Sequence, residues 1–194
     1  LLYKPRGYLS TVSDPHGGRL VTQLVPGQAR LYPVGRLDRD SEGLMLLTND
    51  GELALRLMHP RYEHAKEYLA LARGAVDDAA LARLGQGLLL AEEGVTVQAQ
   101  ARRLPPGWAW RGQPAPPGRA WLQVTLTEGR KRQIRRMLSA VGLRVERLIR
   151  VRLGALALGD LQPGQGRWLN APEVSALRAA AGLGEPSSKQ TEGL

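Results

Sequence analysis

The 194-residue sequence predicts an α+β fold with a central mixed, mostly antiparallel sheet and flanking helices. Two observations predict it. Strand-like segments outnumber helical ones, and they follow one another in runs instead of alternating regularly with helices, as a doubly wound parallel sheet requires. With 43% hydrophobic residues, a chain of this length buries a substantial core. We expect a single domain over residues 1–181 and a polar tail without fixed structure over 182–194.

The sequence of the first third of the chain predicts short strands and one helix. Residues 1–13 contain two extended pieces around the Pro-x-Gly turn at 4–7, and residues 44–48 form a strand covered on both faces. Asn49 precedes Glu52 by three residues, a spacing typical of a helix N-cap and its reciprocal partner. The residues of this helix expected to point inward are Leu53, Leu57 and Met58.

The rest of the chain predicts strands around one basic helix. Strands are expected at residues 66–73, 95–101, 122–126 and 145–158, the last with a break at Gly154. Helices are expected at 77–84, capped by Asp77 and stopped by glycines, at 130–141, ended by Gly142, and at 172–181. Residues 102–119 hold five prolines and three glycines with Trp108 and Trp110, and predict a surface insertion.

The composition excludes several classes of protein. The absence of cysteine excludes a disulfide scaffold, a thiol nucleophile and Cys-ligated metal. Of the three histidines, His59 and His64 are separated by Pro60 and share no helix face, so a His-based metal centre is not expected. The longest apolar runs are far shorter than a membrane span, and no secretion signal opens the chain. We therefore expect a soluble, cytoplasmic, monomeric protein, and a segment before Leu1 stays possible.

The charge of the chain favours an anionic partner such as nucleic acid. The formal net charge is +9, and 23 of the 27 basic residues are arginine. Arginine suits bidentate contacts to phosphates, although a GC-rich genome also favours arginine codons. The charge is concentrated in residues 128–152, which hold nine basic and two acidic residues. A helix there places Ile134 and Met137 inward and several guanidinium groups at one end, which indicates a phosphate-binding surface or a solvated basic face.

Two further patterns point to chemistry. Asp38 lies between Arg36 and Arg39 in a glycine-bracketed loop, 35–43, before a buried strand. A carboxylate held there in one orientation suits a nucleophile or a general base, and the alternative is a charged surface turn. On a strand, Lys66 and Tyr68 point to the same side, so Tyr68 is either a stacking platform for an unstacked base or a half-buried strand residue.

Five segments in order resemble the motifs of the pseudouridine synthases of the RsuA-type family. The catalytic motif is matched by Gly35-Arg36-Leu37-Asp38-x-Asp40-Ser41-x-Gly43-Leu44 with Leu46 to Gly51. The others are Lys4-Pro5-x-Gly7, Lys66-x-Tyr68, Glu128-Gly129-Arg130-x-x-Gln133-Ile134-Arg135-Arg136-Met137 and Leu148-Ile149-Arg150-x-x-x-Gly154. The loop sequence and the 102–119 insertion are most similar to the E type among the synthases of the ribosomal large subunit, a type that lacks the S4-type RNA-binding domain. Tyr3 departs from the family, which usually has Asn there.

The resemblance implies a function and a set of roles. The chain would isomerise a uridine of ribosomal RNA, most simply large-subunit RNA, to pseudouridine without cofactor or metal, and residues 1–181 would be its catalytic domain. Asp38 would be the catalytic aspartate, Tyr68 would stack on the target uracil and Arg135 would orient Asp38. The residues expected to bind substrate are Arg36, Lys4, Arg130, Gln133 and Arg136.

Two other classes of function stay open. A basic surface alone would suffice for an RNA-binding or ribosome-assembly protein without chemistry, although such a protein needs no Asp38, Tyr68 and Arg135 together. A metal-dependent nuclease needs clustered carboxylates, whereas Asp38 and Asp40 alternate within one arginine-rich loop. Insensitivity to chelators would separate the nuclease from the other two.

Overall fold

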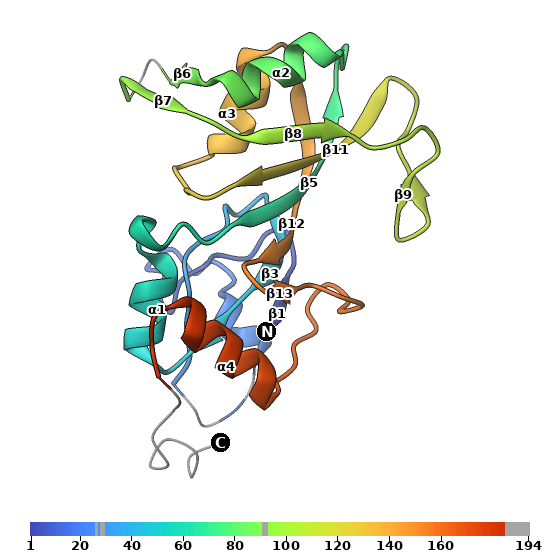
Figure 1. The fold of residues 1–194 in the computed structure, drawn as a ribbon. Helices are drawn as coiled ribbons and strands as arrows, with labels where there is room; N and C mark the ends of the chain where they lie inside the picture. Colours follow the sequence, from blue (N-terminus) through green and yellow to red (C-terminus); the bar gives the residue numbers. More distant parts are fainter. Residues whose placement is uncertain (26, 28–29, 91–92, 185–194) are drawn as a thin grey trace. The chain divides into compact units, whose positions relative to one another are not determined.

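The computed structural model describes residues 1–25, 27, 30–90 and 93–184. Residues 1–64 and those from 152 onward form one compact unit, unit 1, and residues 65–151 form a second, unit 2 (Figure 1). Unit 2 is thus a continuous segment inserted between the two parts of unit 1. Of the expected tail, residues 182–184 continue from the last helix, and 185–194 lie outside the described residues.

Unit 1 consists of short strands, two α-helices and two 3₁₀ turns. Its elements are β1 (Leu2–Lys4), η1 (Val21–Leu24), β2 (Tyr32–Pro33), β3 (Glu42–Met45), β4 (Leu47–Thr48), α1 (Gly51–Met58), η2 (Pro60–Tyr62), β13 (Leu156–Ala157) and α4 (Ala171–Ala180). Strand β1 pairs antiparallel with β3, so that Lys4 lies opposite Gly43. This pairing places the N-terminal segment directly beside the charged loop that precedes β3.

Unit 2 is a mainly antiparallel arrangement of strands, with two α-helices among its described residues. Its elements are β5 (Lys66–Arg73), α2 (Asp78–Gln86), β6 (Leu88–Leu90), β7 (Val95–Val97), β8 (Gln100–Arg103), β9 (Ala109–Trp110), β10 (Gln113–Pro114), β11 (Arg119–Leu126), α3 (Gln133–Ala140) and most of β12 (Arg144–Leu153). The strand order is β12-β5-β11-β8, and α2 packs on β8 while α3 packs near β6 (Figure 1). The expected α+β class with a mostly antiparallel sheet is confirmed.

The alternation predicted for 122–126 and the strand predicted for 66–73 together form the core of unit 2. The register of β5 and β11 places Tyr68 opposite Val124 and Ala70 opposite Leu122, and all four are buried. The alternate residues Glu67 and Thr125 are only half-buried, because successive strand residues point to opposite faces. Each fully buried Leu or Val contributes roughly 1.5–3 kcal/mol, and Leu69 and Trp121 on the opposite face are buried as well, so burial on both faces stabilises the pairing of these two strands.

Helix α1 begins one residue later than the sequence pattern indicated. Asp50, not Asn49, is the N-cap, and its carboxylate accepts from Leu53 N at 2.9 Å. The same carboxylate pairs with Arg178 of α4 at 2.8 Å, a contact 128 residues away in sequence. Leu53 and Leu57 are buried as expected, whereas the inward placement of Met58 is wrong, because its side chain at the last turn is 48% exposed.

Several other predicted elements differ in their extent. The strand expected over 95–101 is two strands, β7 and β8, because Gln98 and Ala99 break the ladder between them. Helix α3 starts at Gln133 and not at residue 130, since the preceding residues form a turn with Arg132 in the left-handed region at φ +52°. The expected stop at Gly142 is confirmed: it adopts φ +80° and the Leu143 N–H bonds to Leu138 O, the Schellman geometry.

Candidate active site

The N-terminal segment holds the loop that carries Asp38 by its backbone. Carbonyl groups on both sides of Asp38 accept hydrogen bonds from this segment: Leu37 O from Ser10 Oγ at 2.9 Å, Asp38 O and Ser41 O from Lys4 Nζ at 3.1 and 2.6 Å, and Arg39 O from Gly7 N at 2.7 Å. The Asp38 side chain itself is partly exposed. These bonds hold the backbone on both sides of Asp38 in place, so the residue from which the carboxylate extends has a defined position.

Lys4 is fully buried and holds this loop, which differs from the expected role. Its ammonium group also donates to Pro5 O at 3.1 Å, so three carbonyl groups surround it. None of the residue is exposed, and an RNA phosphate cannot reach it unless the loop opens. In this structure Lys4 positions the Asp38 loop, and its expected contact with substrate stays a prediction. Sequence reasoning found the residue by its motif but missed this role, because its partners lie 34 and 37 residues away.

The departure at Tyr3 has a structural explanation. The Tyr3 hydroxyl donates to Glu42 Oε2 at 2.8 Å, and both side chains are buried beneath the loop. A buried carboxylate requires such a donor, since an unpaired one is costly. Tyrosine at this position thus makes a polar contact of its own, to a residue next to the Lys4 partner Ser41.

The two arginines of the loop face solvent, unlike Glu42. Arg36 and Arg39 are exposed, and Asp40 is half-buried. Arg36, an expected substrate contact, is therefore accessible to a polyanion. The loop is a charged turn, as its composition indicated, but one whose backbone is held from within unit 1.

Unit 2 carries the other candidate residues. Tyr68 lies on β5 and is 7% exposed, more buried than an open stacking platform. Arg135 lies in the first turn of α3 and donates from Nη1 to Val145 O at 3.1 Å, which ties this helix to β12. Its side chain is half-buried. Both residues thus have fixed positions within unit 2.

Gln133 closes the turn before α3 and does not face solvent. Its Nε2 donates to Glu128 Oε1 at 2.7 Å, and its Oε1 accepts from Arg130 N at 3.0 Å. Only 3% of the residue is exposed. Gln133 has a structural role here, because both polar ends of its amide are bonded within the turn, and its expected contact with substrate stays a prediction.

Glu93 partly neutralises the basic end of α3. Arg130 lies 3.3 Å from Glu93 Oε2 and 3.1 Å from Glu128, and Arg136 pairs with Glu93 Oε1. The hydrogen bond from Arg136, more than any other contact, lowers the pKa of Glu93. Two of the guanidinium groups expected at this end, those of Arg130 and Arg136, are therefore paired with carboxylates. These pairs are solvent-accessible and weak, so a phosphate can replace Glu93 at small cost.

Lys66 is a polar group whose environment the sequence did not reveal. Its Nζ donates to Thr127 O at 2.7 Å. Partial burial, and then repulsion by Arg150, lower its pKa to about 8, while Glu128 opposes the shift. A lysine that titrates near neutral pH can exchange a proton during a reaction.

We expect the Lys66 amine to titrate near pH 8 in the folded protein. The chain has only four lysines, so NMR of lysine labelled at Cε resolves few signals, and Lys66→Met identifies the one in question. Because the folded pKa of about 8 is below the unfolded value, the burial of this amine disfavours folding below pH 8, and that penalty disappears as the pH rises toward 10.5. A Lys66 signal that does not move between pH 7 and 9 would contradict this.

Within the described ranges, no group of three or more His, Asp or Glu residues is placed to hold a metal ion. No helix there has the length and apolarity needed to cross a membrane.

Comparison with known proteins agrees with the motif order. A family model described as RNA pseudouridylate synthase matches residues 1–140, a span that contains the Asp38 loop, Tyr68 and Arg135. The chain belongs to the RNA pseudouridylate synthase family. It is therefore an RNA pseudouridine synthase, an isomerase, and the expectation drawn from the motifs is confirmed.

Relatives of known sequence support the same assignment to the pseudouridylate synthases. An uncharacterized RNA pseudouridine synthase of Mycobacterium tuberculosis is 45% identical over 186 residues, 94% of this chain and 69% of the relative. The ribosomal large subunit pseudouridine synthase E of Xanthomonas campestris is 45% identical over 188 residues, 92% of this chain and 98% of the relative. The B enzyme of Bacillus subtilis is 42% identical over 186 residues, 95% of this chain and 73% of the relative.

Solved structures show the pseudouridylate synthase fold. A crystal structure of a pseudouridylate synthase matches with a TM-score of 0.78 and 29% identity, and covers 91% of this chain and 71% of that one. An archaeal box H/ACA Nop10-Cbf5 complex matches with a TM-score of 0.59 at 18% identity, over 84% of this chain and 50% of that one, which supports the fold alone.

Proposed function

We propose that this pseudouridine synthase acts on a uridine of large-subunit ribosomal RNA. The similarity to both the E and the B enzymes of the large ribosomal subunit supports this substrate. The observation that carries the catalytic proposal is the Asp38 loop, whose backbone is bonded on both sides of a partly exposed carboxylate. Action in the cytoplasm, as a monomer, belongs to the same proposal.

The reaction explains why a fixed carboxylate is needed. The C1′–N1 bond of uridine breaks, the uracil turns, and C5 joins C1′ while the hydrogen at C5 leaves as a proton and N1 gains one. Cleavage of a glycosidic bond develops positive charge on the sugar, which a preorganised carboxylate stabilises. Asp38 can attack C1′, attack C6 of the base, or remove a proton from the sugar, and each of the three requires its ionised form.

Tyr68 and Arg135 complete the proposed machinery. The uridine must leave its base stack to be reached, at a cost of a few kcal/mol. In the proposal, the Tyr68 ring receives the uracil and offsets part of this cost, and Arg135 orients Asp38. Arg36, Arg130 and Arg136 bind phosphates, the last two by exchanging Glu93 for RNA.

Mapping the pseudouridines of ribosomal RNA from cells that lack this protein tests the proposal. We expect at least one large-subunit pseudouridine to be missing, and to return when the wild-type gene is restored. Restoration by an Asp38→Asn gene as well would favour an assembly factor without chemistry. An unchanged ribosomal RNA, with a pseudouridine missing from another RNA, would contradict the proposed substrate.

We expect Tyr68→Phe to keep most activity and Tyr68→Leu to lose about 10- to 100-fold, because stacking of a base on an aromatic ring is worth about 1–3 kcal/mol. Turnover of ribosomal RNA under single-turnover conditions measures this. Tyr68 is buried, so the folded fraction of each variant is determined by urea denaturation and turnover is expressed per folded molecule. Equal losses in both variants would show that the hydroxyl group matters and not the ring.

A further inference from the structure

Residues 102–119 of unit 2, here called the arm, form a projecting structure that the reaction does not use. The arm leaves the sheet at the end of β8 and returns at the start of β11, and it carries β9 away from the other strands (Figure 1). Strands β9 and β10 pair antiparallel, with Trp110 opposite Gln113. The two residues between them, Arg111 and Gly112, have φ of +50° and +77°, so the arm ends in a tight hairpin turn of the type whose twist matches the strands.

The arm is anchored to the sheet of unit 2. The Trp108 ring meets Trp121 of β11 edge-on, with centroids 5.9 Å apart. Arg147 of β12 donates to Gln113 Oε1 at 3.2 Å, and Arg119 pairs with Glu146 at 2.9 Å. These contacts hold the arm from its base and its hairpin strands. Its composition of Pro, Gly and Trp therefore builds a shaped surface with a defined position.

The surface of the arm is basic and contains no carboxylate. No Asp or Glu occurs between residues 94 and 127, a stretch that contains four arginines: Arg102, Arg103, Arg111 and Arg119. Arg102 and Arg103 lie on the edge strand β8, are exposed, and make no side-chain hydrogen bond or ion pair with any residue in the described part of the chain. They differ in this from Arg130 and Arg136, which Glu93 partly neutralises.

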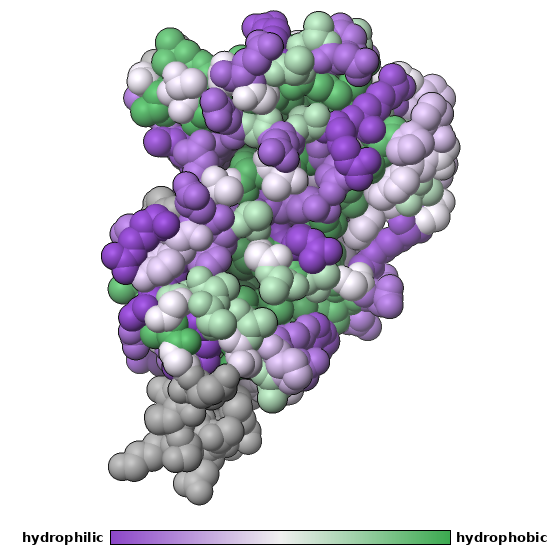
Figure 2. Space-filling model, viewed as in Figure 1, coloured by the Kyte–Doolittle hydropathy of each residue, from purple (hydrophilic) through white to green (hydrophobic). Residues whose placement is uncertain are grey.

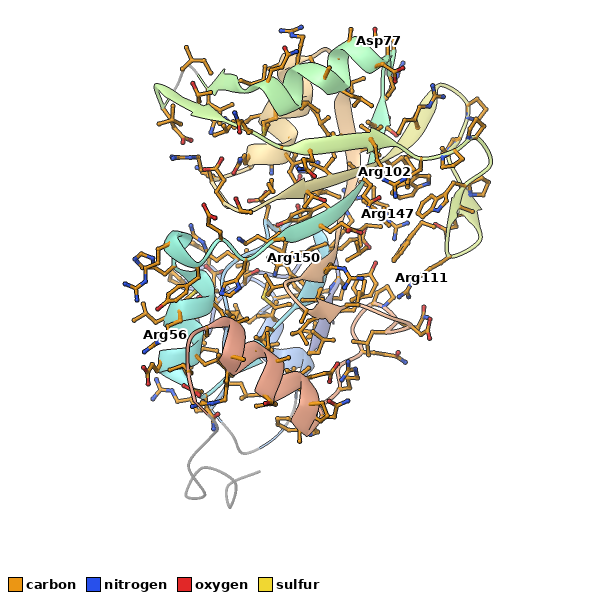
Figure 3. The ribbon with its side chains drawn as sticks, viewed as in Figure 1. Arg56, Asp77, Arg102, Arg111, Arg147 and Arg150 are labelled. Atoms are coloured by element: carbon orange, nitrogen blue, oxygen red, sulfur yellow. The ribbon has the colours of Figure 1, made fainter. Side chains whose placement is uncertain are left out.

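Aromatic rings accompany these arginines. The Arg111 guanidinium lies over the Trp110 ring, 5.0 Å from its centroid, and Trp108 and Trp110 are both half-buried. Arg102, Arg111 and Arg147 come from three different strands or turns and lie on the side of unit 2 from which the arm projects (Figure 3). In the same view, weakly coloured residues of the arm lie beside strongly hydrophilic ones (Figure 2).

We propose that the arm is a second RNA-binding surface, which holds the phosphate backbone of substrate RNA away from the uridine that reacts. The exposed guanidinium groups of Arg102 and Arg103, which have no carboxylate partner among the described residues, can bind phosphates at little cost, and aromatic side chains offer faces for unpaired bases. This inference rests on the proposed function, since it takes RNA as the substrate. It makes the arm a determinant of which RNA region is captured and leaves the chemistry to the Asp38 loop.

Charge reversal on the arm tests this, with a matched control on the same unit. Arg102→Glu is compared with Arg83→Glu, because Arg83 is also an exposed arginine of unit 2, on α2, and forms no ion pair with any residue that the structure describes. The probes are a full-length large-subunit RNA transcript with tritium at uridine C5 and a short transcript around the uridine identified by mapping. Filter binding gives Kd at several salt concentrations, and tritium release gives kcat and KM.

On the full-length transcript we expect Arg102→Glu to raise Kd and KM about fivefold or more with kcat unchanged, and to reduce the slope of log Kd against log salt by about 0.7–0.9. Arg83→Glu should change either value less than twofold, and the short transcript should bind both variants alike. Equal effects of the two variants, or a loss in kcat alone, would overturn the arm proposal. An absence of tritium release by the wild-type protein would instead overturn the proposed function, and the filter-binding comparison would still decide whether the arm binds RNA.

Discussion

Asp38→Asn is expected to reduce pseudouridine formation by about 10³-fold or more while RNA binding stays nearly unchanged. Asparagine keeps the shape of the side chain and most of its hydrogen bonding but has neither the charge nor the nucleophilicity of a carboxylate. The backbone around residue 38 is held through carbonyl groups, so the substitution leaves the loop in place. Single-turnover tritium release measures the chemical step, and filter binding measures affinity.

Asp40→Asn is the matched control, since it makes the same chemical change in the same loop. It should retain measurable turnover, because the proposed chemistry uses only Asp38. Substantial turnover by Asp38→Asn would refute the catalytic assignment. A parallel loss of turnover, binding and cooperative unfolding would show that Asp38 serves the loop structure instead.

Lys4→Met is expected to destabilise the protein by about 3 kcal/mol or more and to abolish turnover with it. The carbonyl groups of Pro5, Asp38 and Ser41 each lose a donor, and hydrogen bonds to a charged group are worth about 1.5–3 kcal/mol. Methionine fills a similar volume, so the loss reports the ammonium group and not a cavity. Urea denaturation measures the free energy of unfolding.

Lys131→Met provides the comparison for stability, because Lys131 is exposed in the turn before α3. Its free energy of unfolding should stay within about 0.5 kcal/mol of the wild-type value, the usual range for a surface substitution. Similar stability of the two variants would mean that Lys4 does not hold the loop. If Lys4→Met is unstable but fully active per folded molecule, the loop keeps its geometry without the amine.

The strands were predictable where one face is buried. The apolar run of β5 and the alternation of Leu122, Val124 and Leu126 in β11 are local properties of the sequence, and the expected range 66–73 agrees with the observed strand. Asp77 and Gly142 were found in the same way, because caps are satisfied within a few residues. The sequence did not identify Asp50 as the N-cap of α1, because Asn49 is an equally good capping residue. In the structure Asp50 also forms an ion pair with Arg178, which is distant in sequence.

The residues of the candidate site could be predicted from the sequence. Which of them support the structure and which are accessible to substrate could not. The motifs singled out Lys4 and Gln133, and both are buried structural residues. Nothing near Lys4 in sequence indicates that its amine meets carbonyl groups more than 30 residues away. The pairing of Arg136 with Glu93 spans 43 residues and likewise has no local signal. Sequence patterns report periodicity and caps, whereas these roles depend on tertiary contacts.

Unit 1 is formed by two segments that are separated in sequence by unit 2, and this sets the order in which the two units can fold during synthesis. The backbone of Tyr3, next to Lys4, bonds to residues 164 and 165, which are synthesised about 160 residues later. At 5–20 residues per second, that interval is roughly 8–30 s. Unit 2 is continuous and is complete on the ribosome before the strand that carries Lys4 finds these partners. The backbone bonds from residues 164 and 165 to Tyr3 therefore form only after unit 2 has been synthesised, so a chain that stops before residue 164 contains all of the basic unit 2 but lacks these supports of the strand that carries Lys4.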